Sequence, residues 1–371
     1  MADNGLFTAN RGSLVGPTLQ SKMRAIVVER QGSPVTPNIR LREDWPDASA
    51  GSLPHGYALV RTLATALNHM DLWVGRGVPG LSLTYPRISG CDACGVVEAV
   101  GAGVDSSWIG RRVIVNAAIR IPDRSRPDDP PGSSLAPDYE LVGEHHHGML
   151  AEKFAIPAAN MARVDDSADP SHAAAFGLCA LTAYSMVRTK ADLRPGQSVL
   201  ITGIGGGVAT AALAIAKHLG CPVAVTSRHA WKIDRARELG ADLGIIDQGQ
   251  DWSKQVRAWT GKRGVDLAVD SSGKATHLNC VKSLARGGCY ATPGCTSGPD
   301  AVTDLARIFW NQLRLLGSTM GTNEEFHEVA ALFRAGHLAP VVDHIHTPDR
   351  CQEAYARLEA GEQFGKIVIR W

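Results

Sequence analysis

The feature that most constrains the fold is an alternation of two patterns between residues 198 and 318. Short apolar and β-branched runs are separated by stretches with the spacing of an amphipathic helix. The expected strands are Ser198–Thr202, Val223–Ser227, Leu243–Ile246, Leu267–Asp270, Cys289–Thr292 and Leu315–Ser318. The expected helices are Ala209–Leu219, Trp231–Leu239, Trp252–Thr260 and Thr276–Leu284. Strands that alternate with helices in this way predict a parallel, doubly wound α/β sheet.

The chain before this alternation has a β-rich pattern that ends at a predicted helix, Ser171–Thr189. The expected strands are Arg24–Glu29, Tyr57–Thr65, Ala93–Val100, Arg111–Val115 and Met149–Ile156. Residues 124–134 are rich in Pro, Asp and Arg and predict an exposed loop. A chain of 371 residues exceeds what one hydrophobic core usually supports, so two domains are expected. A late helix, Asp349–Ala360, and a late strand, Lys366–Ile369, indicate a return to the first domain.

Composition excludes several classes of protein. The formal net charge of +1 gives no reason to expect a nucleic-acid partner or a charged membrane surface. No apolar run reaches about 18 residues, so no membrane-spanning helix is expected. Residues 1–22 are polar and lack the apolar segment of a secretion signal, which predicts a loosely ordered extension. The eight cysteines do not indicate a disulfide scaffold, and the expected compartment is the reducing cytoplasm.

A glycine-rich run, Thr202 to Ala209, leaves the first strand of the alternation and opens the first helix. Such a turn places free backbone N–H groups and the positive end of a helix dipole beside a phosphate. The G-x-G-x-x-G spacing fails because Val208 occupies the third glycine position. The predicted pyrophosphate-binding positions are Gly203, Gly205, Gly206, Gly207 and Val208. The alternative is a glycine-rich loop without a ligand.

The end of the second strand indicates which dinucleotide is bound. A site that prefers NAD places Asp or Glu there to bind the ribose 2′-hydroxyl. Here the strand ends in Ser227 and Arg228, and the acid is absent. Arg228 can form charge-assisted hydrogen bonds to a 2′-phosphate, and Lys232 lies one helical turn further. The sequence therefore predicts NADP(H), with a merely solvent-exposed Arg and Lys as the alternative.

From about Met23 to Trp371 the chain resembles the medium-chain dehydrogenase/reductase superfamily, which contains zinc alcohol dehydrogenases and zinc-free quinone and enoyl reductases. Besides the glycine-rich run, the matching segments are Leu67–Asp71, Gly90–Val97, Ala180–Tyr184, Asp270–Gly273, Gly317–Gly321 and Gly365–Val368. The resemblance implies a GroES-like, β-rich substrate domain over residues 23–174 and 321–371. A Rossmann cofactor domain over residues 175–320 interrupts it, and the active site lies between the two domains.

The same resemblance shows that the zinc-ligand positions have changed. A catalytic zinc requires three protein ligands and an open position. These positions correspond to Asn68, Cys91 and Leu178 in this chain. Asn is a poor zinc ligand and Leu cannot bind zinc, so we expect no zinc. The alternative is a displaced site built from His69, Cys91, Asp92 and Cys179.

Other motifs that could bind metal have plainer interpretations. The structural zinc lobe of the family carries four cysteines, and the corresponding stretch, Ala117–Gly148, has none. The run His145-His146-His147 is interpreted as a turn, because adjacent side chains of an extended chain point in opposite directions. Cys91 and Cys94 form a C-x-x-C, which is two ligands short of a zinc site, and are interpreted as packing residues.

Without zinc, oxidation of a simple alcohol loses its main electrophile, whereas a quinone or an α,β-unsaturated carbonyl is already electron-poor. We therefore predict reduction of a small hydrophobic acceptor of that class by NADPH. By resemblance, Thr182 lies under the nicotinamide ring and Lys366 reaches the pyrophosphate side. Backbone groups near Pro293, Ser318 and Met320 hold the carboxamide. The predicted acceptor-facing residues are Asn68, His69 and Tyr85.

Alternatives accompany these roles. Asn68 could serve only its own turn, Tyr85 could be a packed aromatic, and His69 could face solvent. Asp71 is expected to be a structural hydrogen-bonding group, and Asp92 could pair with Lys366. Two other functions stay open: an alcohol dehydrogenase or carbonyl reductase with an atypical zinc site, and a non-catalytic NADPH-binding protein. The resemblance also predicts a homodimer through residues 308–316, which could equally be core.

Overall fold

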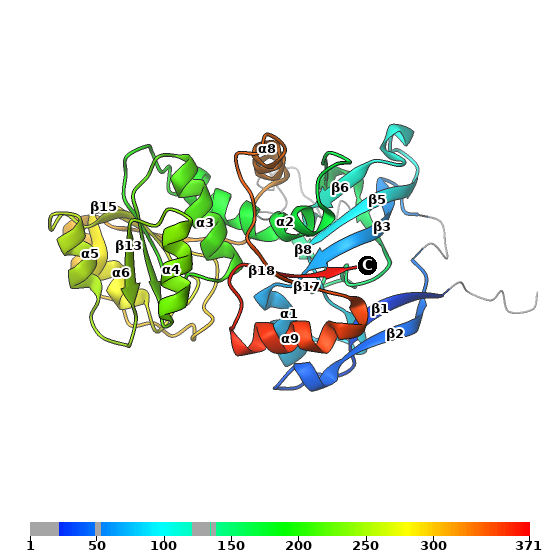
Figure 1. The fold of residues 1–371 in the computed structure, drawn as a ribbon, viewed down its shortest axis with the longest axis horizontal. Coiled ribbons are helices and arrows are strands. Elements are labelled where there is room, and N and C mark those ends of the chain that lie inside the picture. The colour runs from blue at the N-terminus through cyan, green and yellow to red at the C-terminus, as the bar shows by residue number, and fades with distance from the viewer. Residues whose placement is uncertain (1–21, 49–52, 121–133, 135–138) are drawn as a thin grey trace, which may run out of the picture.

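The computed structural model describes residues 22–48, 53–120, 134 and 139–371. The predicted N-terminal extension therefore lies outside the described residues, apart from Lys22, and so does the loop predicted at 124–134, apart from Ser134. Figure 1 shows two groups of strands, with helix α2 (Pro170–Tyr184) lying between them. No helix of the described residues has the length and apolar character needed to cross a membrane.

The alternating part of the chain forms the predicted parallel sheet, which has six strands in the order β13-β12-β11-β14-β15-β16. These strands are β11 (Val199–Ile201), β12 (Val223–Ser227), β13 (Leu243–Ile246), β14 (Val265–Val269), β15 (Leu284–Thr292) and β16 (Arg314–Gly317). The helices of this unit are α3 (Gly207–His218), α4 (Ala230–Glu238), α5 (Ser253–Trp259), α6 (His277–Ser283) and α7 (Leu305–Asn311). Every residue of β11 and β12 is buried, as expected for central strands of a parallel sheet.

The rest of the chain builds a seven-stranded sheet in the order β10-β6-β5-β3-β18-β17, in which β9 also pairs with β3. Its strands are β3 (Tyr57–Ala66), β5 (Ala93–Val100), β6 (Arg112–Val115), β9 (Lys153–Pro157), β10 (Met161–Arg163), β17 (Val342–His346) and β18 (Lys366–Arg370). Smaller sheets contain β1 (Lys22–Val28), β2 (Ile39–Pro46), β4 (Arg87–Ile88), β7 (Ala118–Arg120) and β8 (Tyr139–Leu141). Val368 of β18 lies opposite Ala66 of β3, so the chain does return to the sheet of its first part.

The remaining helices are α1 (His69–Arg76), α8 (Asn323–Arg334) and α9 (Cys351–Ala360), and α2 continues into a π-helical segment, Ser185–Lys190. Local signals place their starts. The Asp169 side chain accepts a hydrogen bond from the Ser171 N–H at 2.9 Å and precedes Pro170 in the first turn of α2. Thr322 and Glu325 form a capping box at the start of α8.

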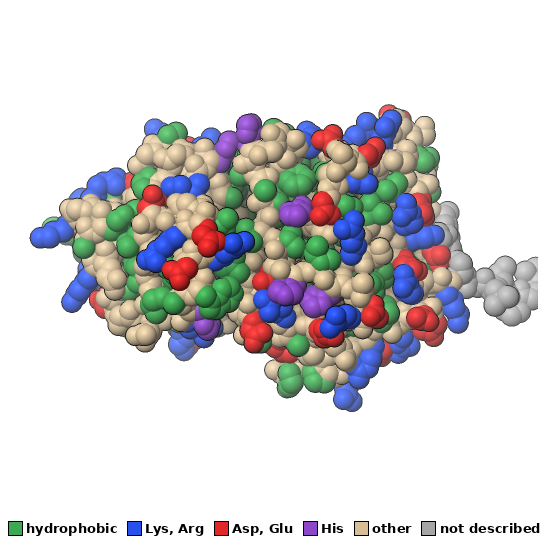
Figure 2. Space-filling view, in the orientation of Figure 1, with side chains coloured by type: hydrophobic (Ala, Val, Ile, Leu, Met, Phe, Trp, Pro, Cys, Tyr) green, Lys and Arg blue, Asp and Glu red, His purple; other side chains and the backbone are tan. Residues whose placement is uncertain are grey.

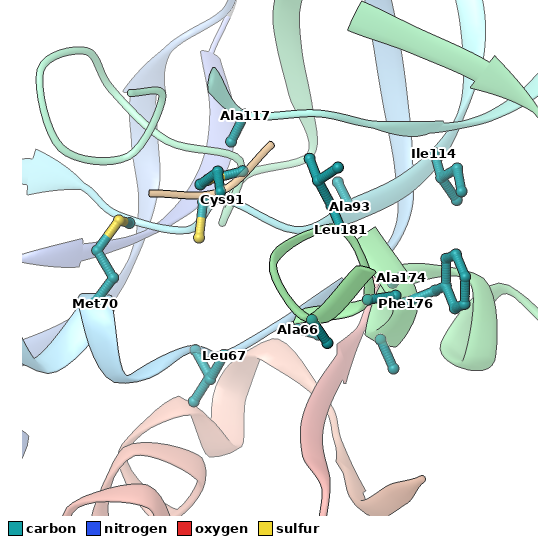
Figure 3. Close-up of a cluster of buried hydrophobic side chains, with 14 of the residues drawn as sticks. Ala66, Leu67, Met70, Cys91, Ala93, Ile114, Ala117, Ala174, Phe176 and Leu181 are labelled. Carbon is teal, nitrogen blue, oxygen red and sulfur yellow. The ribbon is translucent and has the colours of Figure 1, made fainter. Parts of the chain in front are cut away.

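One hydrophobic core contains side chains from both sheets, including Phe176 and Leu181 of α2. Figure 3 shows part of it, where these two α2 side chains lie in the same cluster as Ala66, Ala93 and Ile114 of the larger sheet. A second, smaller core lies within the six-stranded unit. The shared core fixes the two units against each other. On the surface in view in Figure 2, acidic and basic side chains are interspersed, in keeping with the net charge of +1.

Candidate functional site

Several of the residues predicted to bind a dinucleotide, among them the glycine-rich run, Ser227, Pro293 and Ser318, lie at one edge of the six-stranded sheet. Thr202 follows β11, Ser227 ends β12, Asp270 follows β14, and Ser318 follows β16. Pro293 comes directly after the last residue of β15. Because all these strands run parallel and in register, their carboxyl ends lie side by side. Open α/β sheets bind their ligands at this edge.

The glycine-rich turn needs glycine for two separate reasons. Gly203 and Gly205 have φ values of 60° and 114°, a region that side chains disfavour. Gly207 is tightly packed: a Cβ there would lie 2.6 Å from Sγ of Cys179 and 2.8 Å from Cδ of Lys366. In addition, the Gly365 N–H donates to the Gly205 carbonyl at 2.8 Å. The turn is therefore held directly against α2 and β18 of the other unit.

Two cations flank this turn. Arg228 is exposed after β12, and within the described part of the chain no acidic side chain forms an ion pair with it. The Lys232 side chain is buried beside this turn. A Cβ on Gly205 would lie 2.8 Å from Cδ of Lys232 and 3.3 Å from its Nζ. The same Nζ donates to the Gly361 carbonyl at 2.7 Å. Burial lowers the pKa of Lys232. An ammonium without a carboxylate partner beside a glycine-rich turn suits an anionic ligand.

The place where the resemblance puts the family's zinc ligands, here Asn68, Cys91 and Leu178, contains a buried hydrogen-bonded cluster around Lys366, which is 3% exposed. Its Nζ donates to Oδ2 of Asp92 at 2.8 Å and to Oδ1 of Asn68 at 2.5 Å, and it lies 3.7 Å from Sγ of Cys179. Burial alone lowers the pKa of Lys366, but the Asp92 carboxylate more than reverses this and raises it. The predicted pairing of Asp92 with Lys366 is confirmed, and the Lys366 ammonium points to Asp92 rather than to the glycine-rich turn beside its stem.

Asn68 completes the cluster, and its amide is fully engaged. Nδ2 donates to Oδ2 of Asp92 at 2.9 Å and lies 3.3 Å from Sγ of Cys91, while Oδ1 accepts from Lys366 and from the Cys179 thiol. The side chain is 6% exposed. The Asn68 side chain is thus bound to residues of other elements rather than only to its own turn, and its role as an acceptor-facing residue stays a prediction.

This arrangement does not fit zinc. Leu178 contributes only its backbone N–H, which donates to Oδ1 of Asp92 at 2.6 Å. The Cys179 thiol donates to Oδ1 of Asn68 at 3.3 Å, and burial raises the pKa of Cys91 well above its ordinary value and that of Cys179 to about 11. Among the described residues no group of three or more His, Cys, Asp or Glu could hold a metal ion. The displaced site proposed from His69, Cys91, Asp92 and Cys179 is therefore not formed.

The other two acceptor-facing candidates differ from each other. The Tyr85 hydroxyl donates to the Val74 carbonyl at 2.5 Å, which matches the packed alternative. His69 starts α1, contacts the Trp73 ring edge-on, and has its pKa lowered by burial. Trp73 in turn reaches Gly294, where a Cβ would lie 3.5 Å from its ring. His69 and Trp73 thus lie at the turn that follows β15, and His69 stays a prediction as an acceptor-facing residue.

The segment after β16 has an unusual conformation. Ser318 accepts a hydrogen bond from Nζ of Lys190 at 2.8 Å, and Met320 has a φ of 48° although it carries a side chain. Thr182, in contrast, directs its hydroxyl to the Leu178 carbonyl of its own helix at 2.7 Å. Sequence reasoning missed Lys190, because nothing in a lysine at the end of a helix indicates that it will reach another strand's end.

The remaining metal-like motifs have structural roles. His145 Nδ1 accepts from the Leu141 N–H, His147 Nδ1 accepts from the Ile88 N–H, and His146 pairs with Glu140. Burial raises the pKa of Cys94 to about 12, so its thiol is protonated near neutral pH. Cys91 lies in the buried cluster with Met70 and Ala117 (Figure 3). The interpretation of the three histidines as a turn and of the two cysteines as packing residues agrees with these contacts.

Asp71 accepts from the Asn68 N–H at 2.7 Å, as a structural residue would. It also illustrates what burial does to a carboxyl group. Its pKa is raised to about 6, first by burial and despite the hydrogen bond from Asn68. Its other oxygen, Oδ1, has no hydrogen-bond partner among the described residues. The group belongs to the first turn of α1 and is fully buried, in keeping with a structural role.

Two family models match the chain: an alcohol dehydrogenase GroES-like domain over residues 54–166 and a zinc-binding dehydrogenase over residues 207–335. A solved structure described as an NAD-dependent alcohol dehydrogenase is 35% identical, covers 94% of this chain and 100% of its own, and superposes with a TM-score of 0.86. The chain therefore belongs to the medium-chain dehydrogenase/reductase superfamily, as its sequence predicted, and it is an oxidoreductase of α/β fold with GroES-like and Rossmann-like sheets.

Curated relatives include both branches of that superfamily. A zinc-type alcohol dehydrogenase-like protein of Leptosphaeria maculans is 29% identical over 84% of this chain and 89% of its own. A crotonyl-CoA reductase of Streptomyces avermitilis is 26% identical over 98% of this chain and 91% of its own. These two relatives are thus named for different reactions, one as an alcohol dehydrogenase-like protein and the other as a crotonyl-CoA reductase.

Proposed function

We propose that this protein is an NADPH-dependent reductase that transfers hydride to a small hydrophobic quinone or α,β-unsaturated carbonyl without a metal ion. The observation that carries the proposal is the Lys366 ammonium. It is buried against Asp92 and Asn68, at the position where zinc members of the superfamily bind their metal. A substrate oxygen has no Lewis acid to approach there, so an acceptor that is already electron-poor is favoured.

Bound NADPH would supply the hydride, and the chain's own residues would bind and orient the reactants. The N-terminus of α3 and the glycine-rich turn offer backbone N–H groups to the pyrophosphate. Arg228 and Lys232 supply positive charge for the 2′-phosphate. Residues after β15 and β16 border the nicotinamide end, where Trp73 and Met320 present apolar surface to an acceptor. Trp73 is half-buried and Met320 buried, which suits exclusion of water.

The test is a panel of acceptors assayed with purified protein by NADPH oxidation, together with metal analysis of the same sample. We expect turnover with a quinone or an enone, less than about 0.1 zinc per chain, and activity that survives prolonged EDTA. Cys91→Ser should stay folded and active, because its neighbours in the cluster do not depend on a thiolate. Zinc at one per chain, lost to chelator together with activity, would refute the proposal.

A second candidate is an alcohol dehydrogenase. The 35% identical structure is described as an NAD-dependent alcohol dehydrogenase, and one matching family model is a zinc-binding dehydrogenase. The two candidates differ in a simple measurement. The metal-free protein should oxidise simple alcohols with NAD or NADP much more slowly than it reduces an enone. Faster alcohol oxidation would favour the second candidate, and NAD as the better cofactor would refute the NADPH part of the first.

A further inference from the structure

Asp270 is a buried acid that the proposed chemistry does not use. It follows β14 and is 0% exposed. In the described part of the chain no Lys, Arg or His forms an ion pair with it, and its oxygens accept hydrogen bonds from hydroxyl and backbone N–H donors. A buried carboxyl group without a cation is costly unless hydrogen bonds satisfy it. This cost indicates that the hydrogen bonds around Asp270 matter to the arrangement of the site.

The donors to Asp270 come from the segments that follow β11 and β14 and from β15. The hydroxyl of Thr202, at the start of the glycine-rich turn, donates to Oδ1 at 2.5 Å. The Ser272 N–H donates to Oδ1 at 2.9 Å, and the Thr276 hydroxyl donates at 2.8 Å. From β15, the Tyr290 hydroxyl donates to Oδ2 at 2.9 Å. One carboxyl group thus joins the ends of β11 and β14 to the strand that leads to Pro293.

Neighbouring contacts make this junction stiff. A Cβ on Gly203 would lie 3.1 Å from Oγ of Ser272, so the glycine-rich turn rests on the turn after β14. The Ser297 N–H and hydroxyl both donate to the Ser272 carbonyl, which ties in the loop after Pro293. The Tyr290 ring is held edge-on by His277, with ring centres 4.7 Å apart.

We infer that Asp270 is a positioning residue for the dinucleotide: it sets the glycine-rich turn and the Pro293 turn at a fixed spacing, so that pyrophosphate and nicotinamide are bound at once. The inference rests on the proposed dinucleotide-dependent function. Its chemical basis is that a carboxyl group can accept from all four donors together. An amide cannot, because its single oxygen could keep the Thr202 hydroxyl and the Ser272 N–H, while its NH₂ would stand where Oδ2 now accepts and the Tyr290 hydroxyl would have to turn and accept instead.

The test compares Asp270→Asn with Asp266→Asn, a matched control at the opposite end of the same strand. Asp266 is also mostly buried and accepts from the Ser198 N–H at 2.8 Å, far from the ligand edge. Titrations measure the dissociation constants of NADPH and of 2′-AMP, which reaches only the Arg228 end. Asp270→Asn should weaken NADPH on the order of tenfold and lower kcat, while 2′-AMP changes less than about twofold. Asp266→Asn should leave both constants unchanged.

A second variant keeps the inference testable if Asp270→Asn is poorly folded. Tyr290→Phe removes one donor only and should change NADPH binding in the same direction by a smaller factor. The inference is overturned if Asp270→Asn binds and turns over NADPH like the unmodified protein. It is also overturned if NADPH and 2′-AMP weaken equally in step with a fall in Tm. If the unmodified protein binds NADH instead, the NADPH proposal fails, and the same comparison with NADH and AMP still tests Asp270.

Discussion

The cluster around Lys366 shows how a single side chain can change what a site can hold. An ammonium and a carboxylate that are buried together depend on each other, because either one alone would be an uncompensated charge in a medium that solvates it poorly. The side chains of Lys366 and Asp92 are 4% and 0% exposed. Their pairing therefore makes a definite prediction about stability.

Lys366→Met should lower the free energy of unfolding by about 3–5 kcal/mol, because it leaves the Asp92 carboxylate buried without its cation. Adding Asp92→Asn removes that charge and should recover part of the loss. Urea unfolding of the two variants and the unmodified protein measures both steps. Lys282→Met, which breaks a surface pair with Asp251, is the control and should cost less than about 1 kcal/mol. Equal stability of the single and double variants would contradict the role given to the pair.

Arg228 carries the prediction for cofactor choice. Arg228→Ala should raise the KM for NADPH on the order of tenfold to a hundredfold, since a charge-assisted hydrogen bond contributes about 1.5–3 kcal/mol, and should hardly change the KM for NADH. Initial-rate measurements with both cofactors test this. Arg235→Ala, in helix α4 that follows Arg228 and paired with Glu238, is the matched control. Equal use of both cofactors by the unmodified protein would be the contrary result.

For single residues, the sequence was informative where a property depends on the residue type alone. Leu178 cannot bind zinc in any fold, and the glycines after β11 could be recognised from their order. The cluster itself could not be predicted in full, because Lys366 and Asn68 are 298 residues apart in the chain. Nor could Asp270 be given a role, since its partners come from the segments after β11 and β14 and from β15, which lie apart in the sequence.

Among the secondary-structure elements, α9 shows how a helix is fixed to its neighbours through one acid. Glu359 accepts hydrogen bonds from the backbone N–H groups of Val35 and Thr36, from the Thr36 hydroxyl and from Nη2 of Arg76. Burial alone raises the pKa of Glu359, but these hydrogen bonds outweigh it and lower the pKa to about 2. The ordinary value is 4.5, so the carboxylate stabilises the folded state above pH 4.5 and this contribution is lost as the pH falls toward 2.

Glu359→Gln should therefore destabilise the protein at pH 7 by roughly 1–3 kcal/mol, and the difference from the unmodified protein should shrink as the pH falls from 4.5 toward 2. Urea unfolding at several pH values measures it. Glu353→Gln alters an exposed pair with Arg350 on the same helix and should have little effect. A difference that does not vary with pH would show that lost packing, not the charge, is responsible.

Elements with a continuous apolar pattern were predicted well, and those that depend on a neighbour were not. Central strands such as β11 and β12 could be identified because they are buried and largely apolar, whereas β16 lies at the sheet edge and is marked mainly by its two leucines. The missed strand β17 contains Asp343 and two histidines, and only its pairing with β18 makes it a strand. Helix α1 was missed because its start, Asn68 to Asp71, was interpreted as an active-site motif. The predicted helix Thr276–Leu284 ends one residue early, since Leu284 begins β15.

For the molecule as a whole, one apolar surface has no partner within the described chain. Helix α7 has no buried residue, and β16 is an edge strand. The exposed side chains are Val302, Leu305, Phe309, Trp310 and Leu315. Phe309 and Trp310 are each 69% exposed, so the alternative that they belong to the core is wrong. Large exposed apolar groups beside an open sheet edge favour the homodimer that the resemblance predicted.

We expect the protein to be a dimer at micromolar concentration and Phe309→Asp to make it a monomer, because a carboxylate would be desolvated at the interface. Light scattering measures the mass of each. Ile109→Asp changes an apolar side chain that is 49% exposed elsewhere and should leave the dimer intact. A monomeric mass for the unmodified protein would refute the proposal.

The pairing of β18 with β3 has a consequence for biosynthesis. Val368 lies opposite Ala66, yet the complete six-stranded sheet is encoded between them. On the ribosome, the Rossmann-like unit emerges as one continuous stretch and can fold as soon as it is made. The first domain must wait, with the edge of β3 open and Asp92 without its cation, until residues 366–370 arrive. Translation that stops after β16 but before β18 would therefore yield a folded cofactor unit attached to an incomplete, aggregation-prone sheet.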